Sequence, residues 1–309
     1  ILVSLLLFMV AGFASAQTPY PAKPMRMIIP YPPGGGTDIL GRPIAKLLGD
    51  KLGQQVIIDN RGGAAGTIAA DLVAKAPNDG YTLGLAHVNA MSIIPALGQK
   101  MPYNASTDFT PIVLLGITPN ILIANVDAPA KNVKDLVAYL KQNPGKVSFG
   151  SAGNGSAGHL AAEMFKRDAG IFAVHIPYNG GNPAQLALLS GQVDFNFDNL
   201  ATAAPNIKAG KLKALAVTTA QRSSALPDIP AMAETLKGFE VDTWWGLVAP
   251  ANTPPAVVAR LHQAFAAALN APETKTRFGL MMAEPVSSTP EQFAAFMKRE
   301  LTKYEPVVK

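Results

Sequence analysis

Cysteine is absent from the 309 residues of this chain. Its absence excludes disulfide scaffolds, thiolate zinc sites, iron–sulfur clusters and cysteine nucleophiles. Charged residues make up only 15 % of the chain and aromatic residues 7 %, whereas 49 % of the residues are hydrophobic. A disordered, highly charged tail requires the opposite balance. The composition therefore indicates a globular protein, and the length suits one large domain or two ordinary ones.

Basic residues form no run in the sequence, although the 26 Lys+Arg exceed the 21 Asp+Glu and give a net charge of +5. Nucleic-acid-binding proteins usually gather such residues in a patch. We therefore expect no nucleic-acid partner. The histidines also lack the short spacings that are typical of metal ligands, so neither a metal nor another cofactor is expected.

The first sixteen residues are largely apolar, carry no charge and end in Ala14-Ser15-Ala16. This segment is shorter than the roughly 20 residues that span a bilayer, and a small-x-small triplet is typical of a signal-peptidase site. We predict a secretory signal peptide over residues 1–16, cleaved near Ala16, and an exported mature chain. An N-terminal anchor helix is the alternative.

Strand-like and helix-like segments alternate along the rest of the chain. Short apolar runs predict strands over residues 25–30, 56–58, 82–86, 147–150, 173–176, 193–198 and 214–218. Helical spacing of apolar residues predicts helices over 38–52, 67–76, 133–142, 158–168, 183–190, 254–269 and 290–304. Such alternation is typical of an α/β fold with parallel strands and crossover helices.

The alternation breaks at two places, over residues 109–124 and 244–250, where apolar runs occur without an intervening helix. We interpret each break as a crossing between two domains. This interpretation predicts a discontinuous first lobe over residues 19–118 plus 246–309. The second lobe, over residues 119–245, would be inserted into it.

A glycine-rich segment lies between the first predicted strand and helix, at residues 30–38 (PYPPGGGTD). Glycines allow a ligand to approach the backbone closely, and the start of a helix offers free N–H groups with partial positive charge. The segment therefore predicts an anion site for a phosphate or carboxylate. A tight turn with Thr37 or Asp38 as the helix N-cap is the alternative.

A second segment of this kind occupies residues 151–159 (SAGNGSAGH). Its glycines match the dinucleotide-binding spacing, but no acidic residue occurs over 172–182 to bind a ribose, so NAD binding is not favoured. The hydroxyl and amide groups of Ser151, Asn154 and Ser156 could instead bind a carboxylate without a buried cation. One such site in each domain would place the ligand between the domains.

Three further features leave alternatives open. Asp198 follows a predicted strand, where it either reaches a cleft or caps the next helix. Trp244 and Trp245 lie at the second break and either line a cleft or pack in the core. An exported serine hydrolase is the alternative function, although residues 154–158 (NGSAG) lack the first glycine of a nucleophile elbow.

Taken together, the motifs of the mature chain resemble a known family. They are 30–38 with Arg42, 59–61 (DNR), 79–82 (DGYT), 151–156, 177–181 (PYNGG), 191–194 (GQVD), 209–212 (AGKL), 226–230 (LPDIP), 245–246 (WG) and 249–254 (APANTP). Their order along nearly the whole chain resembles the solute-binding proteins of tripartite tricarboxylate transporters, of the Bordetella uptake gene type.

The resemblance implies a fold and a function. The fold would be a two-lobe periplasmic-binding-protein fold (type II, Venus flytrap), each lobe a mostly parallel sheet flanked by helices. The protein would be a monomeric, non-enzymatic periplasmic receptor that captures an organic acid and delivers it to a two-component membrane permease. The acid would be a mono-, di- or tricarboxylate or an aromatic acid.

The resemblance also implies a set of ligand-binding residues. On the first lobe these are Tyr31, Gly36, Thr37 and Asp38, and on the second they are Ser151, Asn154, Ser156 and Asp198. His87 and Tyr178 would form the wall that selects the ligand.

Overall fold

The computed structural model describes residues 20–98, 100–223, 226–280 and 283–308. The predicted signal peptide lies outside these residues. Within them, no helix combines the length and the apolar character that a membrane span requires.

The strands belong to one mixed sheet. Their bounds are β1 (Met25–Ile29), β2 (Val56–Asn60), β3 (Thr82–His87), β4 (Phe109–Asn125), β5 (Ser148–Ser151), β6 (Val174–Pro177), β7 (Phe195–Asn199), β8 (Leu212–Val217), β9 (Asp242–Pro250) and β10 (Glu284–Pro285). The strand order is β2-β1-β3-β9-β4-β7-β5-β6, and both β8 and β10 pair with β4.

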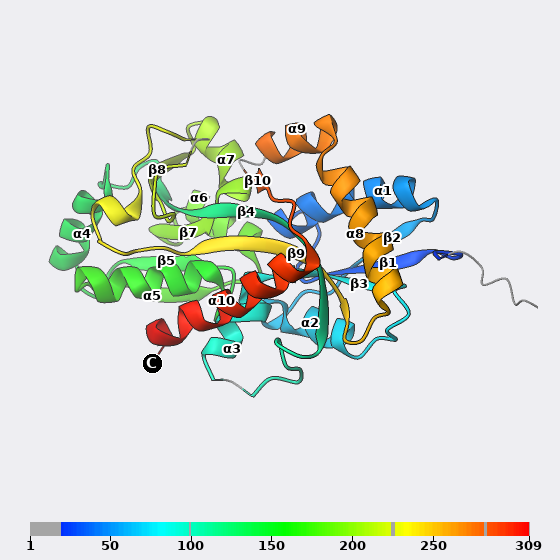
Figure 1. The fold of residues 1–309 in the computed structure, drawn as a ribbon. Coiled ribbons are helices and arrows are strands. Elements are labelled where there is room, and N and C mark those ends of the chain that lie inside the picture. The colour runs from blue at the N-terminus through cyan, green and yellow to red at the C-terminus, as the bar shows by residue number, and fades with distance from the viewer. Residues whose placement is uncertain (1–19, 99, 224–225, 281–282, 309) are drawn as a thin grey trace, which may run out of the picture.

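Helices flank this sheet (Figure 1). They are α1 (Gly36–Leu52), α2 (Thr67–Ala74), α3 (Ile94–Ala96), α4 (Val133–Gln142), α5 (Ala157–Ala169), α6 (Gly181–Leu189), α7 (Leu200–Lys208), α8 (Pro255–Leu269), α9 (Pro272–Leu280) and α10 (Pro290–Val308). Short helical turns occupy Ala64–Gly66, Asn89–Ile93 and Met232–Glu234. The α/β class predicted from the sequence is confirmed.

Strand β4 is shared by the two halves of the sheet. Residues 109–119 pair with β9, whereas residues 120–125 pair with β7 and β8. We call β1, β2, β3, β9 and β10, with residues 109–119, the first half-sheet, and β5 to β8, with residues 120–125, the second half-sheet. Figure 1 shows β4 and β9 running side by side along the molecule. The two breaks noticed in the sequence are these two strands.

Parallel pairing is confined to the outer parts of the sheet. Strands β2-β1-β3 are parallel, as are β7-β5-β6, whereas every pair that involves β4 or β9 is antiparallel. The sheet is therefore mixed, because two long strands without crossover helices form its centre. Each parallel set contains a strand, β1 or β5, whose carboxyl end leads directly into a glycine-rich segment.

The core follows the alternation of side chains along the strands. Along β4, Leu122 belongs to a hydrophobic cluster that extends across both half-sheets, and Ile121 and Ile123 belong to a separate cluster on the opposite face. A third cluster, which includes Met27 and Ile29 of β1, fills the first half-sheet. The opposite face thus carries two separate cores, one for each half-sheet.

Candidate functional site

A cavity of about 280 Å³ lies where the glycine-rich segments of the two half-sheets meet. Its lining includes first-turn residues of four helices, α1, α5, α6 and α7. A helix start presents unpaired N–H groups and a partial positive charge. Among the residues that the structure describes, the lining contains neither lysine nor arginine, and Asp198 is its one carboxylate. Such a cavity can bind an anion through neutral donors.

The structure brings together most of the predicted site residues. Those in the cavity lining are Tyr31, Gly36, Thr37, His87, Ser151, Ser156 and Asp198. Asp38, Asn154 and Tyr178 are outside it. Asn154 is exposed, and Tyr178 packs against the core of the second half-sheet.

The start of α1 forms one wall. Gly34 has a φ of 82°, a conformation that favours glycine, and the chain then enters the helix at Gly36. A Cβ on Gly36 would lie 3.3 Å from Cγ2 of Thr202 in α7. The first turns of α1 and α7 therefore approach each other closely across the cavity.

Asp38 stabilises the glycine-rich segment at residues 30–38 from outside the cavity lining. Its carboxylate accepts hydrogen bonds from the Gly34 N–H (2.9 Å), from Arg42 Nε (2.8 Å) and from Asn60 Nδ2 (2.9 Å). Burial alone would raise the pKa of Asp38, but these hydrogen bonds outweigh it and the pKa is lowered. In this structure Asp38 holds the shape of the glycine-rich loop.

Thr37 is joined to one of the two tryptophans. Trp245 Nε1 donates to Thr37 Oγ1 at 3.1 Å, and Trp245 lines the cavity. Trp244 points the opposite way, as successive residues of a strand do, and donates to Glu300 in α10. Of the two alternatives considered for this pair, lining a cleft applies to Trp245 and packing in the core applies to Trp244.

His87 is a neutral side chain at the end of β3. Burial lowers its pKa to about 3. The Asn89 N–H donates to Nδ1 at 3.2 Å, which leaves the ring proton on Nε2. The Tyr31 ring packs edge-on against His87 with centroids 5.0 Å apart. Burial raises the pKa of Tyr31 well above its usual range, so its hydroxyl also stays uncharged.

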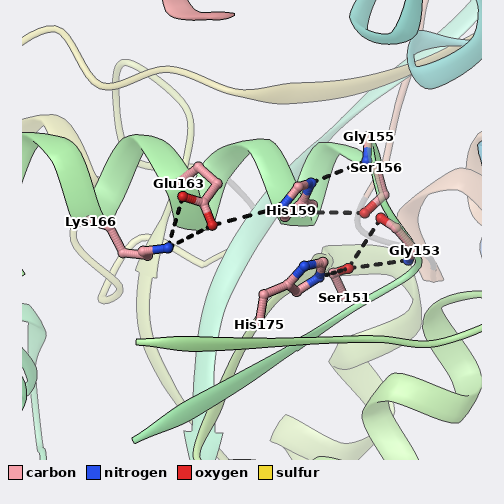
Figure 2. A network of polar contacts seen from close by, with 8 residues as sticks. All are labelled: Ser151, Gly153, Gly155, Ser156, His159, Glu163, Lys166 and His175. Atoms are coloured by element: carbon pink, nitrogen blue, oxygen red, sulfur yellow. Dashed lines mark hydrogen bonds and ion pairs between the residues drawn. The ribbon is translucent and has the colours of Figure 1, made fainter. Parts of the chain in front are cut away.

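The serine-rich loop before α5 forms the facing wall (Figure 2). Ser156 is the N-cap of α5 and accepts the His159 N–H at 3.2 Å. Ser151 Oγ lies 2.7 Å from His175 Nε2, and the His175 ring stacks on His159 with centroids 4.1 Å apart. Among the described residues, no hydrogen bond joins Ser156 to a titratable side chain, as a nucleophile would require.

Asp198 connects α6 and α7. It accepts hydrogen bonds from Gln185 Nε2 (2.8 Å), the Asn199 N–H (2.8 Å) and Thr202 Oγ1 (3.2 Å), and only 7 % of its surface is exposed. Burial raises its pKa to about 6. Asp198 therefore reaches the cavity and braces the next helix, while Asn199 is the N-cap residue.

Asparagines complete the site, and they were not predicted from the sequence. Asn89 and Asn182 bridge the half-sheets, because the Ala157 N–H donates to Asn89 Oδ1 at 2.9 Å and Asn182 Nδ2 donates to the Gly34 carbonyl at 2.8 Å. Asn120 also lines the cavity. For Asn89 and Asn120, only their polarity within apolar segments could have indicated this role, whereas Asn182 lies in the first turn of α6, directly after two glycines. No group of His, Asp or Glu in the described residues could hold a metal ion.

The sequence profile described as "Tripartite tricarboxylate transporter family receptor" matches residues 40–309. Protein BugT of Bordetella pertussis is 36 % identical over 302 residues, which cover 97 % of this chain and 92 % of BugT. A Pseudomonas protein from the tcbD-tcbE intergenic region is also 36 % identical, over 94 % of this chain and 86 % of its own length.

Solved structures agree with this result. The R. palustris protein Rpa4515 with adipate has a TM-score of 0.90 at 35 % identity, covering 93 % of this chain and 97 % of that one. MatC from Rhodopseudomonas palustris with bound malate has a TM-score of 0.89 at 33 % identity, covering 94 % and 100 %. The periplasmic binding protein BugD has 0.88 at 38 %, covering 93 % and 97 %. Nothing in these comparisons supports the hydrolase alternative. The chain belongs to the tripartite tricarboxylate transporter receptor family.

Proposed function

We propose that this protein is a periplasmic receptor that binds an organic acid in the cavity between the half-sheets and delivers it to a two-component membrane permease. The cavity itself carries the proposal, because four helix starts converge on a space whose described lining residues include no cationic side chain. Neutral donors hold a carboxylate at a lower desolvation cost than a buried ion pair would. Two structural relatives were solved with the dicarboxylates adipate and malate.

The ligand-binding residues belong to the same proposal. Direct contacts are assigned to those predicted residues that line the cavity, with Trp245 and Asn89 added to them. The residues outside the lining have other contacts: Asp38 braces its loop, and the Tyr178 N–H donates to the Ser151 carbonyl. Residues 1–16 would be removed on export, which N-terminal sequencing of the secreted chain checks.

Ligand screening tests the proposed function. The mature protein is heated with malate, adipate, citrate, nicotinate or acetate, and in parallel with glucose or putrescine as neutral and cationic controls. At 100 times its Kd a ligand adds about 2.7 kcal/mol of stability, so at least one acid should raise the Tm by about 5 °C or more. Calorimetry then gives its Kd. Stabilisation by glucose or putrescine alone would contradict an acid receptor.

Closure is the second part of the proposal. We propose that the half-sheets act as the two lobes predicted at residues 19–118 plus 246–309 and 119–245, and that the ligand shifts the population toward the closed form. Asn89 and Asn182 already bridge them by hydrogen bonds. The acid that stabilises the protein should lower its radius of gyration in small-angle X-ray scattering. An unchanged radius at saturation would count against closure.

A further inference from the structure

His175 lies directly behind one of the cavity residues without lining the cavity itself. It belongs to β6, opposite Phe149 of β5, and its Nε2 is 2.7 Å from Ser151 Oγ. Its ring stacks on Phe149 and on His159, with centroids 4.8 and 4.1 Å away and interplanar angles of 18° and 14°. Figure 2 shows the His175 ring beside the Ser151 side chain, with His159 above the ring. The ring orientation is therefore fixed by packing.

The hydrogen bonds at Ser151 are coupled to the position of the His175 ring proton. A serine hydroxyl accepts two hydrogen bonds and donates one. Ser151 Oγ accepts from the Gly153 N–H at 3.2 Å and donates to the Gly153 carbonyl at 3.2 Å. When the single hydroxyl proton is directed to the Gly153 carbonyl, the 2.7 Å contact with His175 is a hydrogen bond only if His175 Nε2 carries a proton and donates.

The opposite tautomer would change the character of the cavity wall. If His175 Nε2 accepted, the Ser151 proton would point at the histidine and its oxygen would present only a lone pair to a ligand. A carboxylate oxygen would then meet a second acceptor. With His175 as donor, the Ser151 hydroxyl proton can turn from the Gly153 carbonyl, which it reaches at a long 3.2 Å, to an anion in the cavity.

We propose that His175 is a positioning residue that keeps the Ser151 hydroxyl a hydrogen-bond donor and so selects ligands with a carboxylate or carbonyl oxygen at this wall. This inference rests on the proposed function and adds a residue outside the cavity to it. Burial lowers the pKa values of both His175, to about 4, and His159. The stacked pair is therefore neutral at physiological pH, and it is the tautomer that sets the hydrogen-bond direction.

A double-mutant cycle tests the assignment. Its probe is the one of malate, adipate, citrate, nicotinate and acetate that binds the wild-type protein most tightly. H175F keeps an aromatic ring in the stack but has no N–H, and H175Q keeps a donor near the Nε2 position. We expect S151A and H175F each to weaken binding about tenfold, because each variant removes the hydrogen bond from this wall to a charged ligand group. The double variant should bind no more weakly than the single variants, and H175Q should bind within about threefold of wild type.

A purely structural role would give a different result. H175F would then weaken binding by the same factor with or without Ser151, and that additivity would overturn the proposal. Unchanged affinity in H175F would overturn it as well. H262F is the matched control, because His262 bonds the Ser288 carbonyl far from the cavity, and its affinity should equal that of wild type.

NMR of the free protein separates this inference from the proposed function. The ¹⁵N and ¹³C shifts of labelled His175 should report the Nε2–H tautomer, and the Nδ1–H tautomer would overturn the inference even if acids bind. If none of the five screened acids binds wild type, the proposed function fails and the claim about ligand selection falls with it, whatever the tautomer.

Discussion

At the level of single residues, the described lining of the cavity offers neutral hydrogen-bond donors and one carboxylic acid, Asp198. Thr37, Ser151 and the neutral His87 offer hydroxyl and ring N–H groups, whereas Asp198 is a carboxylate that burial makes costly to ionise. An anionic ligand would raise that cost further. Asp198 should therefore be the residue through which pH acts on this site.

Asp198 makes a testable contribution to stability. Its pKa is about 6 in the folded protein against 3.8 as a free side chain, so between these values the folded protein binds the proton more tightly than the unfolded chain. Its contribution to stability is therefore full below pH 4 and is lost as the pH rises to 6. The stability of D198N relative to wild type should rise by about 2 kcal/mol from pH 4 to pH 7.

Urea unfolding of both proteins across this pH range measures the difference. Parallel stability curves for D198N and wild type would show that Asp198 does not titrate in this window.

Residues of the site differ in how well the sequence predicted them. Gly36 and Thr37 begin α1 and Ser151 ends β5, so all three flank a strand-to-helix connection, where the local sequence itself indicates an anion site. Asn120 lies within a long apolar strand and meets the cavity only because β4 passes there. Its role depends on contacts between distant segments, which no local pattern contains.

Helix starts are the elements that shape the site, and α5 shows how tightly they are held. Gly158 lies in its first turn, and a Cβ there would overlap the carbonyl oxygen of Phe197 in β7. Glycine is thus required for the start of α5 to reach the strand ends that line the cavity.

Replacing this glycine should affect both stability and binding. We expect G158A to destabilise the protein by about 1–3 kcal/mol, because α5 must move off β7, and to weaken acid binding. G279A is the matched control: Gly279 lies in α9 with no atom near its Cβ position, and alanine is the better helix former. Urea unfolding compares the two. Equal stability of G158A and wild type would contradict the close contact.

Most helices were predicted from periodicity, but α7 was not. Its nine residues include Pro205 inside the helix, which weakens the local helical pattern. Leu200, Ala203 and Ala204 are buried in the core of the second half-sheet. Packing rather than intrinsic propensity therefore stabilises α7, and packing is not readable from a local window.

At the scale of the whole molecule, the alternation of elements predicted the α/β class, and its two breaks marked β4 and β9. The sequence did not indicate that these strands pair with each other in antiparallel fashion, because their paired residues are more than a hundred positions apart. The lobe boundaries stay a prediction, which ligand-induced closure would test.

Strand β4 has a consequence for cooperativity. Strand β4 is uninterrupted and supplies backbone hydrogen bonds to both half-sheets. If one half-sheet unfolded alone and pulled β4 out of its pairing, backbone groups of the other half-sheet would be left unpaired. A receptor whose halves move relative to each other should nevertheless melt as one unit. Scanning calorimetry should show a single transition, with equal calorimetric and van't Hoff enthalpies. Two resolved transitions would mean that the shared strand does not couple them.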